Sequence, residues 1–447
     1  MTMSAYWETL PEVVLGKVFR DLDVVGKIAV RSTCLNWQRA SSRPEVWKCF
    51  SYSEKNVWES LFPLGMPASI EDFESYRKFH EELLFCVRIF GEFFKNVELE
   101  LKGTQSWEVF ECLSKVSHRV DSFTLLKRIE GETFSVPLKT AIFEFCKRNV
   151  KITNVHIDDL NFQGQKNEAL PLGLIHSTCL QKLRVVNSFK GCSLSNLMYL
   201  VNLKELTINP NQMNFSLLKH LAGCSLRHLH IVANYKTKDF YNEALSDFHW
   251  KEIRKCGPNL RVDCRLAVLH EWTEKEVLLK ANMPLASLVY RKNRWVKCWS
   301  ELSRILGNYR ETLEELVDFS LSERVYRPSE HMEYSDRIDE HILDIVRCCP
   351  KLSTFTVKET LSSATILLIA FQKRNFPNLF IREDMVTYLN DLPDDITEDM
   401  DAKNFVDNNW QRGMFCRAMS CLLGREWRPL DKEEYYQLVQ EKYSELF

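Results

Sequence analysis

The chain has 447 residues, 45% of them hydrophobic and 27% charged, so it is too long for one compact core and predicts several domains or one extended architecture. With 59 basic and 61 acidic residues its net charge is -2, which gives no overall electrostatic drive toward nucleic acid or anionic membranes. No stretch approaches the roughly 18 apolar residues of a membrane-spanning helix, and the opening MTMSAYWETL lacks the apolar core of a secretory signal. Fifteen cysteines, an odd number without such a signal, predict reduced thiols and a cytoplasmic or nuclear location.

The first strongly patterned segment is LPEVVLGKVFRDL, residues 10–22. Its apolar residues recur at the spacing of an amphipathic helix, at Leu10, Val14, Leu15, Val18, Phe19 and Leu22. We expect two further short helices at 26–33 and 36–40, before Pro44 interrupts the chain. Because such a three-helix unit has a marginal core, the apolar face of the first helix either completes that core or is presented to another protein.

Residues 6–50 resemble an F-box, the helical module by which substrate receptors dock on the Skp-family adaptor of cullin–RING ubiquitin ligases. The resemblance is carried by Leu10-Pro11-Glu12 with the apolar stripe, by Cys34 and Trp37, and by Pro44-Glu45-Val46-Trp47. It implies that the adaptor contacts ten residues, namely Leu10, Pro11, Val14, Leu15, Val18, Phe19, Leu22, Trp37, Val46 and Trp47. Two residues depart from the pattern: Lys27 stands where an apolar residue is common, and Thr33 where a valine is usual.

Residues 51–92 are predicted to connect this module to the rest of the chain. The first part, residues 51–69, contains Pro63, Gly65 and Pro67, a composition typical of a linker. Ser69 followed by Asp72 then predicts the start of a helix that caps the following array.

From residue 94 onward a short pattern recurs, with apolar residues at its first, fourth and sixth positions. Its clearest copies are LQKLRV, LKELTI and LRHLHI, which begin at Leu180, Leu203 and Leu226. Successive copies begin 23 to 39 residues apart, at positions 94, 120, 152, 180, 203, 226, 260, 285, 313 and 352. This period is typical of leucine-rich repeats, in which stacked strand–helix units share one continuous core. We therefore predict an α/β solenoid, with a curved, irregular leucine-rich-repeat array over residues 93–390 between helical caps.

Segments within the array are similar to the family of F-box only protein 39. Examples are ETLEELVDFSLSE (residues 311–323) and HILDIVRCCPKLSTFTV (residues 341–357). The resemblance implies an F-box protein with leucine-rich repeats. Cysteines shortly before the first apolar residue of a repeat are expected to pack as small apolar side chains at the corner from helix to strand, at Cys179, Cys224, Cys256 and Cys349.

Residues 391–447 follow the array. They begin with the acidic stretch DLPDDITEDMD, which we interpret as a solvated loop, the alternative being an acidic contact surface. Residues 402–447 are too aromatic for a disordered tail, so we expect a helical C-terminal cap packed on the array.

The residues between the apolar positions of each copy are expected to point away from the core. On neighbouring strands, about 4.8 Å apart, they would form a polar band with a basic centre. This band is either a solvated face or a surface for an acidic or phosphorylated peptide, with candidate target-binding residues His156, Lys182, Arg184, Glu205, Thr207, His228 and His230. The same band includes Asn96, Glu98, Ser122, Thr124, Asn154, Ser287, Glu315, Thr354 and Thr356. His228 and His230 share one face, but no third ligand has a spacing suited to zinc, so no metal site is predicted.

The sequence contains no phosphate-binding loop, dinucleotide-binding motif, nucleophile elbow or HExxH motif, so we predict no catalytic residue and no cofactor. The resemblance implies the substrate-recognition subunit of an SCF-type (Skp adaptor–cullin–F-box) E3 ubiquitin ligase, with an unknown protein target and no nucleic-acid or membrane partner. Two alternatives stay open. One is a scaffold that binds the adaptor without ubiquitin transfer, and the other is a repeat protein whose N-terminal helices only cap the array.

Overall fold

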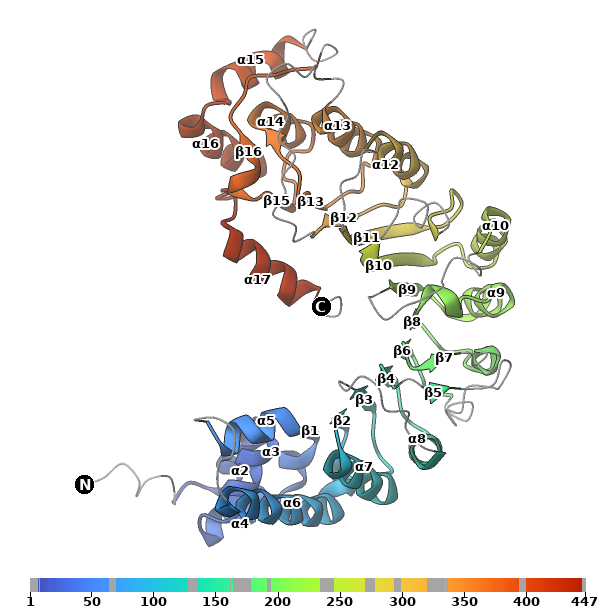
Figure 1. Cartoon of the computed structure of the whole chain (residues 1–447), viewed down its shortest axis with the longest axis vertical. Helices are drawn as coiled ribbons and strands as arrows, with labels where there is room; N and C mark the ends of the chain where they lie inside the picture. The colour runs from blue at the N-terminus through green and yellow to red at the C-terminus, as the bar shows by residue number, and fades with distance from the viewer. Residues whose placement is uncertain are drawn as a thin grey trace, which may run out of the picture. The chain divides into compact units, whose positions relative to one another are not determined.

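The computed structural model describes residues 7, 9–63, 70–127, 136–160, 162–163, 178–190, 194–233, 245–269, 278–292, 299–319, 334, 337–393 and 399–443. It is an α/β protein with an all-parallel sheet of twelve strands that alternate with helices along the chain (Figure 1). The strands lie in the order β1-β2-β3-β4-β6-β8-β9-β10-β11-β12-β13-β15. Apart from β5, β7 and β14, which belong to two small sheets, spatial order therefore follows sequence order.

The strands of the main sheet are β1 (Cys49–Ser53), β2 (Asn96–Leu101), β3 (Ser122–Lys127), β4 (Asn154–Asp158), β6 (Lys182–Val186), β8 (Glu205–Ile208), β9 (His228–Ala233), β10 (Arg261–Leu269), β11 (Leu285–Lys292), β12 (Glu315–Asp318), β13 (Thr354–Thr356) and β15 (Asn378–Phe380). Two small sheets pair β5 (Phe162–Gln163) with β7 (Phe189–Lys190), and β14 (Leu361–Ser362) with β16 (Val386–Thr387). Each of the ten predicted copies coincides with a strand that starts at most two residues after the copy begins. The prediction of a parallel strand–helix alternation is thus confirmed.

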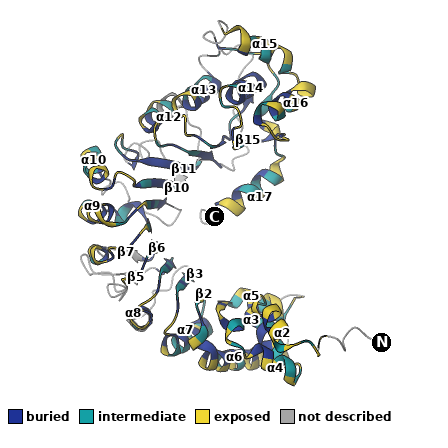
Figure 2. Ribbon diagram, turned by 180° about the vertical axis from the view of Figure 1, so that it is seen from behind, coloured by how far each residue is buried: buried dark blue, intermediate teal, exposed yellow. Residues whose placement is uncertain are grey.

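The alternation of apolar and polar residues explains these strands. In the copy that begins at Leu180, Leu183 and Val185 are 1% and 0% exposed, whereas Lys182 is exposed and Arg184 is partly exposed. Apolar side chains therefore face the helices, and polar side chains form rows on the opposite face of the sheet. We refer to that opposite side as the strand face. Figure 2 shows the buried strands and the exposed outer turns of the helices.

The chain divides into two compact units, of which the first comprises Met1–Thr207 and Ser216–Leu226. Its helices are α2 (Glu12–Arg20), α3 (Val24–Arg31), α4 (Leu35–Ser41), α5 (Glu54–Leu61), α6 (Ile70–Phe90), α7 (Thr104–Val116), α8 (Val136–Arg148) and most of α9 (Phe215–Cys224), with short 3-10 helices η1 (Pro44–Trp47), η2 (Gly91–Phe93) and η4 (Ser195–Tyr199). The three predicted N-terminal helices and the long helix that follows them are therefore confirmed. Asp23 is the N-cap residue of α3, and its carboxylate accepts a hydrogen bond from Gly26 N (2.7 Å).

The prediction of a linker at residues 51–69 is wrong for most of its length. β1 extends to Ser53 and pairs in parallel with β2, and α5 follows it directly. Phe50 and Tyr52 are 3% and 1% exposed and face the core. Trp47, Phe50 and Tyr52 fit the first, fourth and sixth positions of the recurring pattern, but this copy lies before residue 94, where the predicted array begins. Residues 64–69 lie outside the described part. The N-terminal helices thus continue straight into the first strand.

The second unit comprises Ile208–Phe215 and Arg227–Phe447. Its helices are α10 (Asp247–Cys256), α12 (Trp299–Leu306), α13 (Ile338–Cys348), α14 (Ser363–Gln372), α15 (Met400–Asn409), α16 (Arg412–Leu423) and α17 (Lys432–Lys442), with η5 (Pro210–Gln212), η7 (Gly307–Tyr309) and η9 (Glu383–Met385). The predicted helical C-terminal segment corresponds to α15–α17, where Phe415 and Tyr435 are 0% and 1% exposed. Of the predicted acidic loop, residues 394–398 lie outside the described part, while Asp391 forms an ion pair with the buried Arg337.

The cysteine prediction holds at one of its four positions. Cys349 is fully buried, whereas Cys179, Cys224 and Cys256 are exposed. Cys224 and Cys256 are the last residues of α9 and α10. The expected corner packing is therefore wrong for three of the four, because those side chains face solvent.

Candidate interaction surfaces

The three N-terminal helices enclose a small apolar core. On α2, Leu15 and Phe19 are 0% and 3% exposed, and the Phe19 ring lies 5.3 Å from the Trp37 ring of α4. Trp47 of η1 is fully buried and stacks on Phe90 of α6, with ring centroids 4.8 Å apart. This stacking attaches the N-terminal helices to α6 and so to the beginning of the sheet.

Other apolar side chains of these helices stay exposed. Val14 and Val18 are each 43% exposed, Val13 is 51% exposed, and Leu35 at the start of α4 is 71% exposed. Val14 and Val18 lie one helical turn apart and therefore share one face of α2. We refer to Val13, Val14, Val18 and Leu35 as the N-terminal apolar set. The core below them is already filled, so these side chains are available for contact with another molecule.

The structure divides the ten predicted adaptor-binding residues by exposure. Three are exposed (Pro11, Val14, Val18), three are partly exposed (Leu10, Leu22, Trp37) and four are buried by the chain itself (Leu15, Phe19, Val46, Trp47). The last four form the core that positions the helices, and their contact with an adaptor stays a prediction. The sequence pattern missed Val13 and Leu35, which lie outside the apolar spacing but are exposed.

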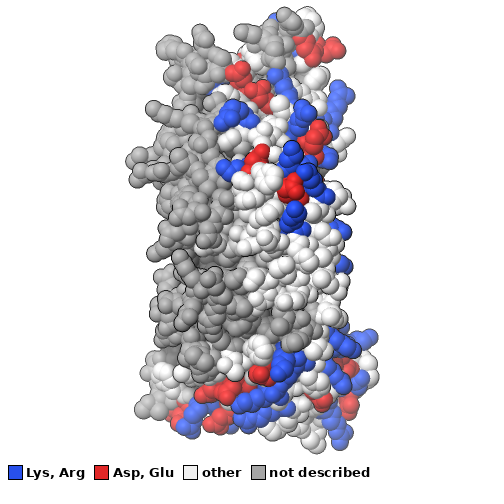
Figure 3. Space-filling model, turned by 90° about the vertical axis from the view of Figure 1, so that its right-hand side faces the viewer, with Lys and Arg blue, Asp and Glu red and all other residues white. Residues whose placement is uncertain are grey.

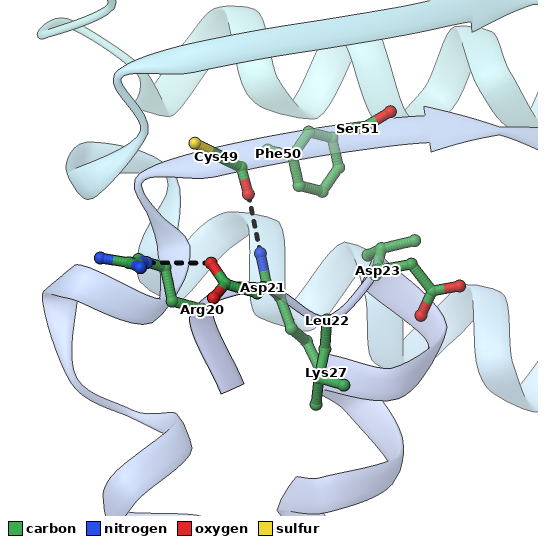
Figure 4. Close-up of a pocket in the computed structure, with 9 residues that line it drawn as sticks. Arg20, Asp21, Leu22, Asp23, Lys27, Cys49, Phe50 and Ser51 are labelled. Atoms are coloured by element: carbon green, nitrogen blue, oxygen red, sulfur yellow. Dashed lines mark hydrogen bonds and ion pairs between the residues drawn. The ribbon is translucent and has the colours of Figure 1, made fainter. Parts of the chain in front are cut away.

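Lys27, which departs from the pattern that the N-terminal segment resembles, is a buried charge on α3. It is 4% exposed, and its Nζ donates a hydrogen bond to the carbonyl of Cys49 in β1 (2.9 Å), as Figure 4 shows. Burial lowers the pKa of Lys27, while the carboxylates of Asp21 and Asp23 act in the opposite direction. A hollow of about 350 Å³ lies between the α2–α3 turn and β1. Since β1 is the first strand of the sheet, its outward carbonyl lacks a neighbouring strand, and the lysine satisfies it.

On the strand face of the first unit, β3, β4, β6 and β8 line a hollow of about 270 Å³, which we refer to as the strand-face hollow. Two rows of side chains cross it in register: Ser122, Asn154 and Lys182 in one row, and Thr124, His156 and Arg184 in the next. Glu205 and Thr207 of β8 complete its lining. The structure thus brings together five of the seven candidate target-binding residues, and His228 and His230 belong to β9 in the second unit.

The basic side chains of the strand-face hollow are paired within the chain. Arg184 Nε lies 2.8 Å from Asp158 Oδ2, and His156 Nε2 lies 2.9 Å from the same oxygen. Lys182 Nζ lies 2.8 Å from Glu205 Oε1. The basic centre predicted from the sequence is therefore balanced by carboxylates at contact distance.

Asp158 is a residue that the sequence analysis did not select. Its burial raises the pKa of the carboxyl group, but the hydrogen bond from His156 and the charge of Arg184 outweigh this effect, so its pKa lies below the usual value. Asp158 stands two residues after His156 and so on the same face of the strand. Extending the alternation by one step would have identified it.

In the second unit, α17 covers part of the strand face at β12 and β13 (Figure 1). Glu315 accepts hydrogen bonds from Lys442 Nζ (2.9 Å) and from the Tyr443 hydroxyl (2.6 Å). Thr356, 4% exposed, donates to the hydroxyl of the buried Tyr435 (3.0 Å). The expectation that Glu315 and Thr356 belong to an open band is thus wrong, because the chain's own C-terminal helix occupies their side of the sheet.

The remaining candidate histidines, His228 and His230, are partly exposed and contact other side chains of the chain. His230 Nδ1 is 3.2 Å from Asp263 Oδ2, and the rings of His228 and His230 are 6.4 Å apart. In the part of the chain that the structure describes, no group of three or more His, Cys, Asp and Glu side chains is arranged to hold a metal ion. Nor does any helix in those ranges combine the length and apolarity needed to cross a membrane.

The charged residues on one face of the molecule are of both signs (Figure 3). On the face shown in Figure 3, Lys and Arg side chains lie beside Asp and Glu side chains. The described surface also carries the exposed N-terminal apolar set and the strand-face hollow. No family model matches the chain.

Proposed function

We propose that this chain is the substrate-recognition subunit of an SCF-type E3 ubiquitin ligase, an F-box protein with leucine-rich repeats related to the F-box only protein 39 family. In this proposal, α2–α4 dock on a Skp-family adaptor and the strand face of the repeat array holds a target protein. The observation that carries the proposal is the exposure of Val13, Val14 and Val18 on α2 above a core that is already complete.

The energetics support a partner for these side chains. Fully burying a valine or leucine is worth about 1.5–3 kcal/mol, and clustered exposed apolar residues on a small helical unit are typical of interaction sites. Leu15, Phe19 and Trp47 fill the core without help from the exposed valines. The N-terminal apolar set therefore contributes little to the stability of the free chain and is suited to docking.

In the proposed role the chain itself performs no bond chemistry. It contributes proximity and orientation, and the RING subunit with its ubiquitin-conjugating enzyme transfers ubiquitin to the bound target. The first unit supports such a role, since β1 follows η1 without a linker and Trp47 stacks on Phe90. We place the activity in the cytosol or nucleus, where thiols stay reduced; the cysteines within the described ranges are free.

Purified full-length chain mixed with a purified Skp-family adaptor tests the proposal. We expect a stable complex in size-exclusion chromatography, and recruitment of cullin and RING subunits when these are added. Adaptor binding without cullin recruitment would favour the alternative of a scaffold outside ubiquitin transfer. Absence of adaptor binding would overturn the proposal and leave a repeat protein capped by its N-terminal helices.

A further inference from the structure

The strand-face hollow combines two kinds of polar side chain, charged ones that form ion pairs within the chain and neutral ones that do not. Arg184 and His156 converge on Asp158, and Lys182 contacts Glu205. Their charges already have partners, and Arg184 has only 17% of its side chain exposed. These groups shape the hollow but do not present free positive charge.

The neutral side chains of the hollow differ from the charged ones. Ser122, Thr124 and Asn154 are each partly exposed, and within the described ranges none of the three side chains has a hydrogen-bond partner. They stand on the adjacent strands β3 and β4, where Ser122 is paired in register with Asn154. Two hydroxyls and an amide, on strands about 4.8 Å apart, can both donate and accept hydrogen bonds to the groups of an extended peptide.

We infer that the strand-face hollow binds an extended peptide segment that is neutral and polar, and not an acidic or phosphorylated one. Ser122, Thr124 and Asn154 form the hydrogen bonds to this segment, and the Arg184–Asp158–His156 cluster fixes the floor beside them. The inference rests on the proposed function for the assignment of the strand face to target binding. It differs from both alternatives that the sequence left open, a solvated face and a surface for an acidic or phosphorylated peptide.

Electrostatics explain this preference. A phosphate or carboxylate group of a ligand that approached Arg184 would also lie close to Asp158, and one that approached Lys182 would lie close to Glu205. Repulsion from the carboxylate would therefore oppose the attraction to the basic side chain. Breaking the existing pairs would also leave a partly buried carboxylate without its partner. A neutral peptide avoids both penalties.

The test uses full-length chain and two degenerate pools of synthetic peptides of about ten residues, long enough to cross the four strands when extended. One pool contains only Asn, Gln, Ser, Thr, Gly and Ala, and the other has the same composition with a fixed phosphoserine flanked by Asp and Glu. Retention on the immobilised chain is measured by mass spectrometry at low and high salt. We expect the neutral pool to be retained at both salt concentrations, because its binding depends little on screened charge.

Two variants make the result specific to the hollow. The triple variant Ser122→Ala, Thr124→Val, Asn154→Leu should lower retention of the neutral pool by about tenfold or more, since several hydrogen bonds are lost. Lys151→Gln, at an exposed residue that does not line the hollow, should leave that retention unchanged. An unchanged thermal melting curve for both variants shows that the fold is retained, as expected for partly exposed side chains.

Each other outcome overturns the inference. Preferential, salt-sensitive retention of the phosphorylated pool that falls in Lys182→Gln would show an acidic ligand. Retention of neither pool, or equal retention by the chain and the triple variant, would show that the hollow is a solvated face. Because the peptides require no adaptor, failure here is distinguishable from failure of the adaptor-binding experiment.

Discussion

The double substitution Val14→Glu, Val18→Glu is expected to abolish adaptor docking while leaving the fold intact. Both side chains lie on one face of α2 and each is 43% exposed, so the free chain tolerates a charged group at either position. In the proposed complex the same side chains are covered by the adaptor, and two carboxylates would be removed from water.

The magnitude follows from the exposed fractions. Full burial of a valine is worth about 1.5–3 kcal/mol, so covering the exposed 43% of each side chain is worth about 0.6–1.3 kcal/mol. Losing both contributions costs about 1.3–2.6 kcal/mol, or about 10- to 70-fold in the dissociation constant. Desolvation of the two carboxylates adds to this loss, so we expect at least about a tenfold weakening.

The assay is isothermal titration of purified adaptor into each variant, with circular dichroism to confirm the fold. Val150→Glu, Val201→Glu is the matched control, because these valines are 49% and 47% exposed but lie outside the N-terminal helices. It should bind as the unmodified chain does. If the Val14 and Val18 variant binds the adaptor within about twofold of the unmodified chain, the assignment of the N-terminal apolar set to docking is refuted.

Three further predictions concern stability and the C-terminal helix. Trp47→Ala should lower the free energy of unfolding in urea by about 3–5 kcal/mol because Trp47 is fully buried, whereas Trp7→Ala, at a 50% exposed residue, should change it by less than about 0.5 kcal/mol; equal losses would contradict the core role of Trp47. The folded-state pKa of Asp158 is lowered, so its contribution to stability is present above its unfolded-state pKa and is lost as the pH falls through the folded value. Asp158→Asn should therefore be less stable at neutral pH and lose less stability on acidification, and parallel stability curves for the two proteins would argue against the ion pairs. Glu315→Ala should accelerate hydrogen–deuterium exchange in α17, while Glu314→Ala, at the adjacent residue, should not; the same exchange in both would exclude the contact of Glu315 with α17.

The repeat pattern predicted the sheet well because it encodes a local property. Each copy places apolar residues on one side of a strand, and that alternation alone identifies β2, β3, β4, β6 and β8–β13. β1 and β15 fit the same pattern, at Trp47, Phe50 and Tyr52 and at Phe376, Leu379 and Ile381, but the predicted copies did not include them. Because the copy at Trp47 was not recognised, residues 51–53 were assigned to a linker, although Phe50 and Tyr52 are buried against the core.

The candidate surfaces were predicted less completely because they depend on contacts between distant segments. The alternation also places Asp158 on the face of Arg184 and His156, but the ion pair between Asp158 and Arg184 depends on β4 and β6 being neighbours. It identified an aromatic, helical C-terminus but not its position. Tyr435 reaches Thr356 across 79 residues of sequence, a contact that local periodicity does not contain.

By itself the sequence determined the amphipathic first helix, the order and spacing of the strands, and which side chains point away from the core, because these follow from the geometry of single helices and strands. Only the tertiary structure decided which apolar residues of the first helix are used internally. Packing of α4 and η1 against α2 buries Leu15 and Phe19 but leaves Val14 and Val18 in water. The reason is that the apolar stripe of α2 is wider than the part that α4 and η1 cover. The tertiary structure likewise decided that basic residues on the strand face meet carboxylates, which leaves neutral groups free to bind a ligand.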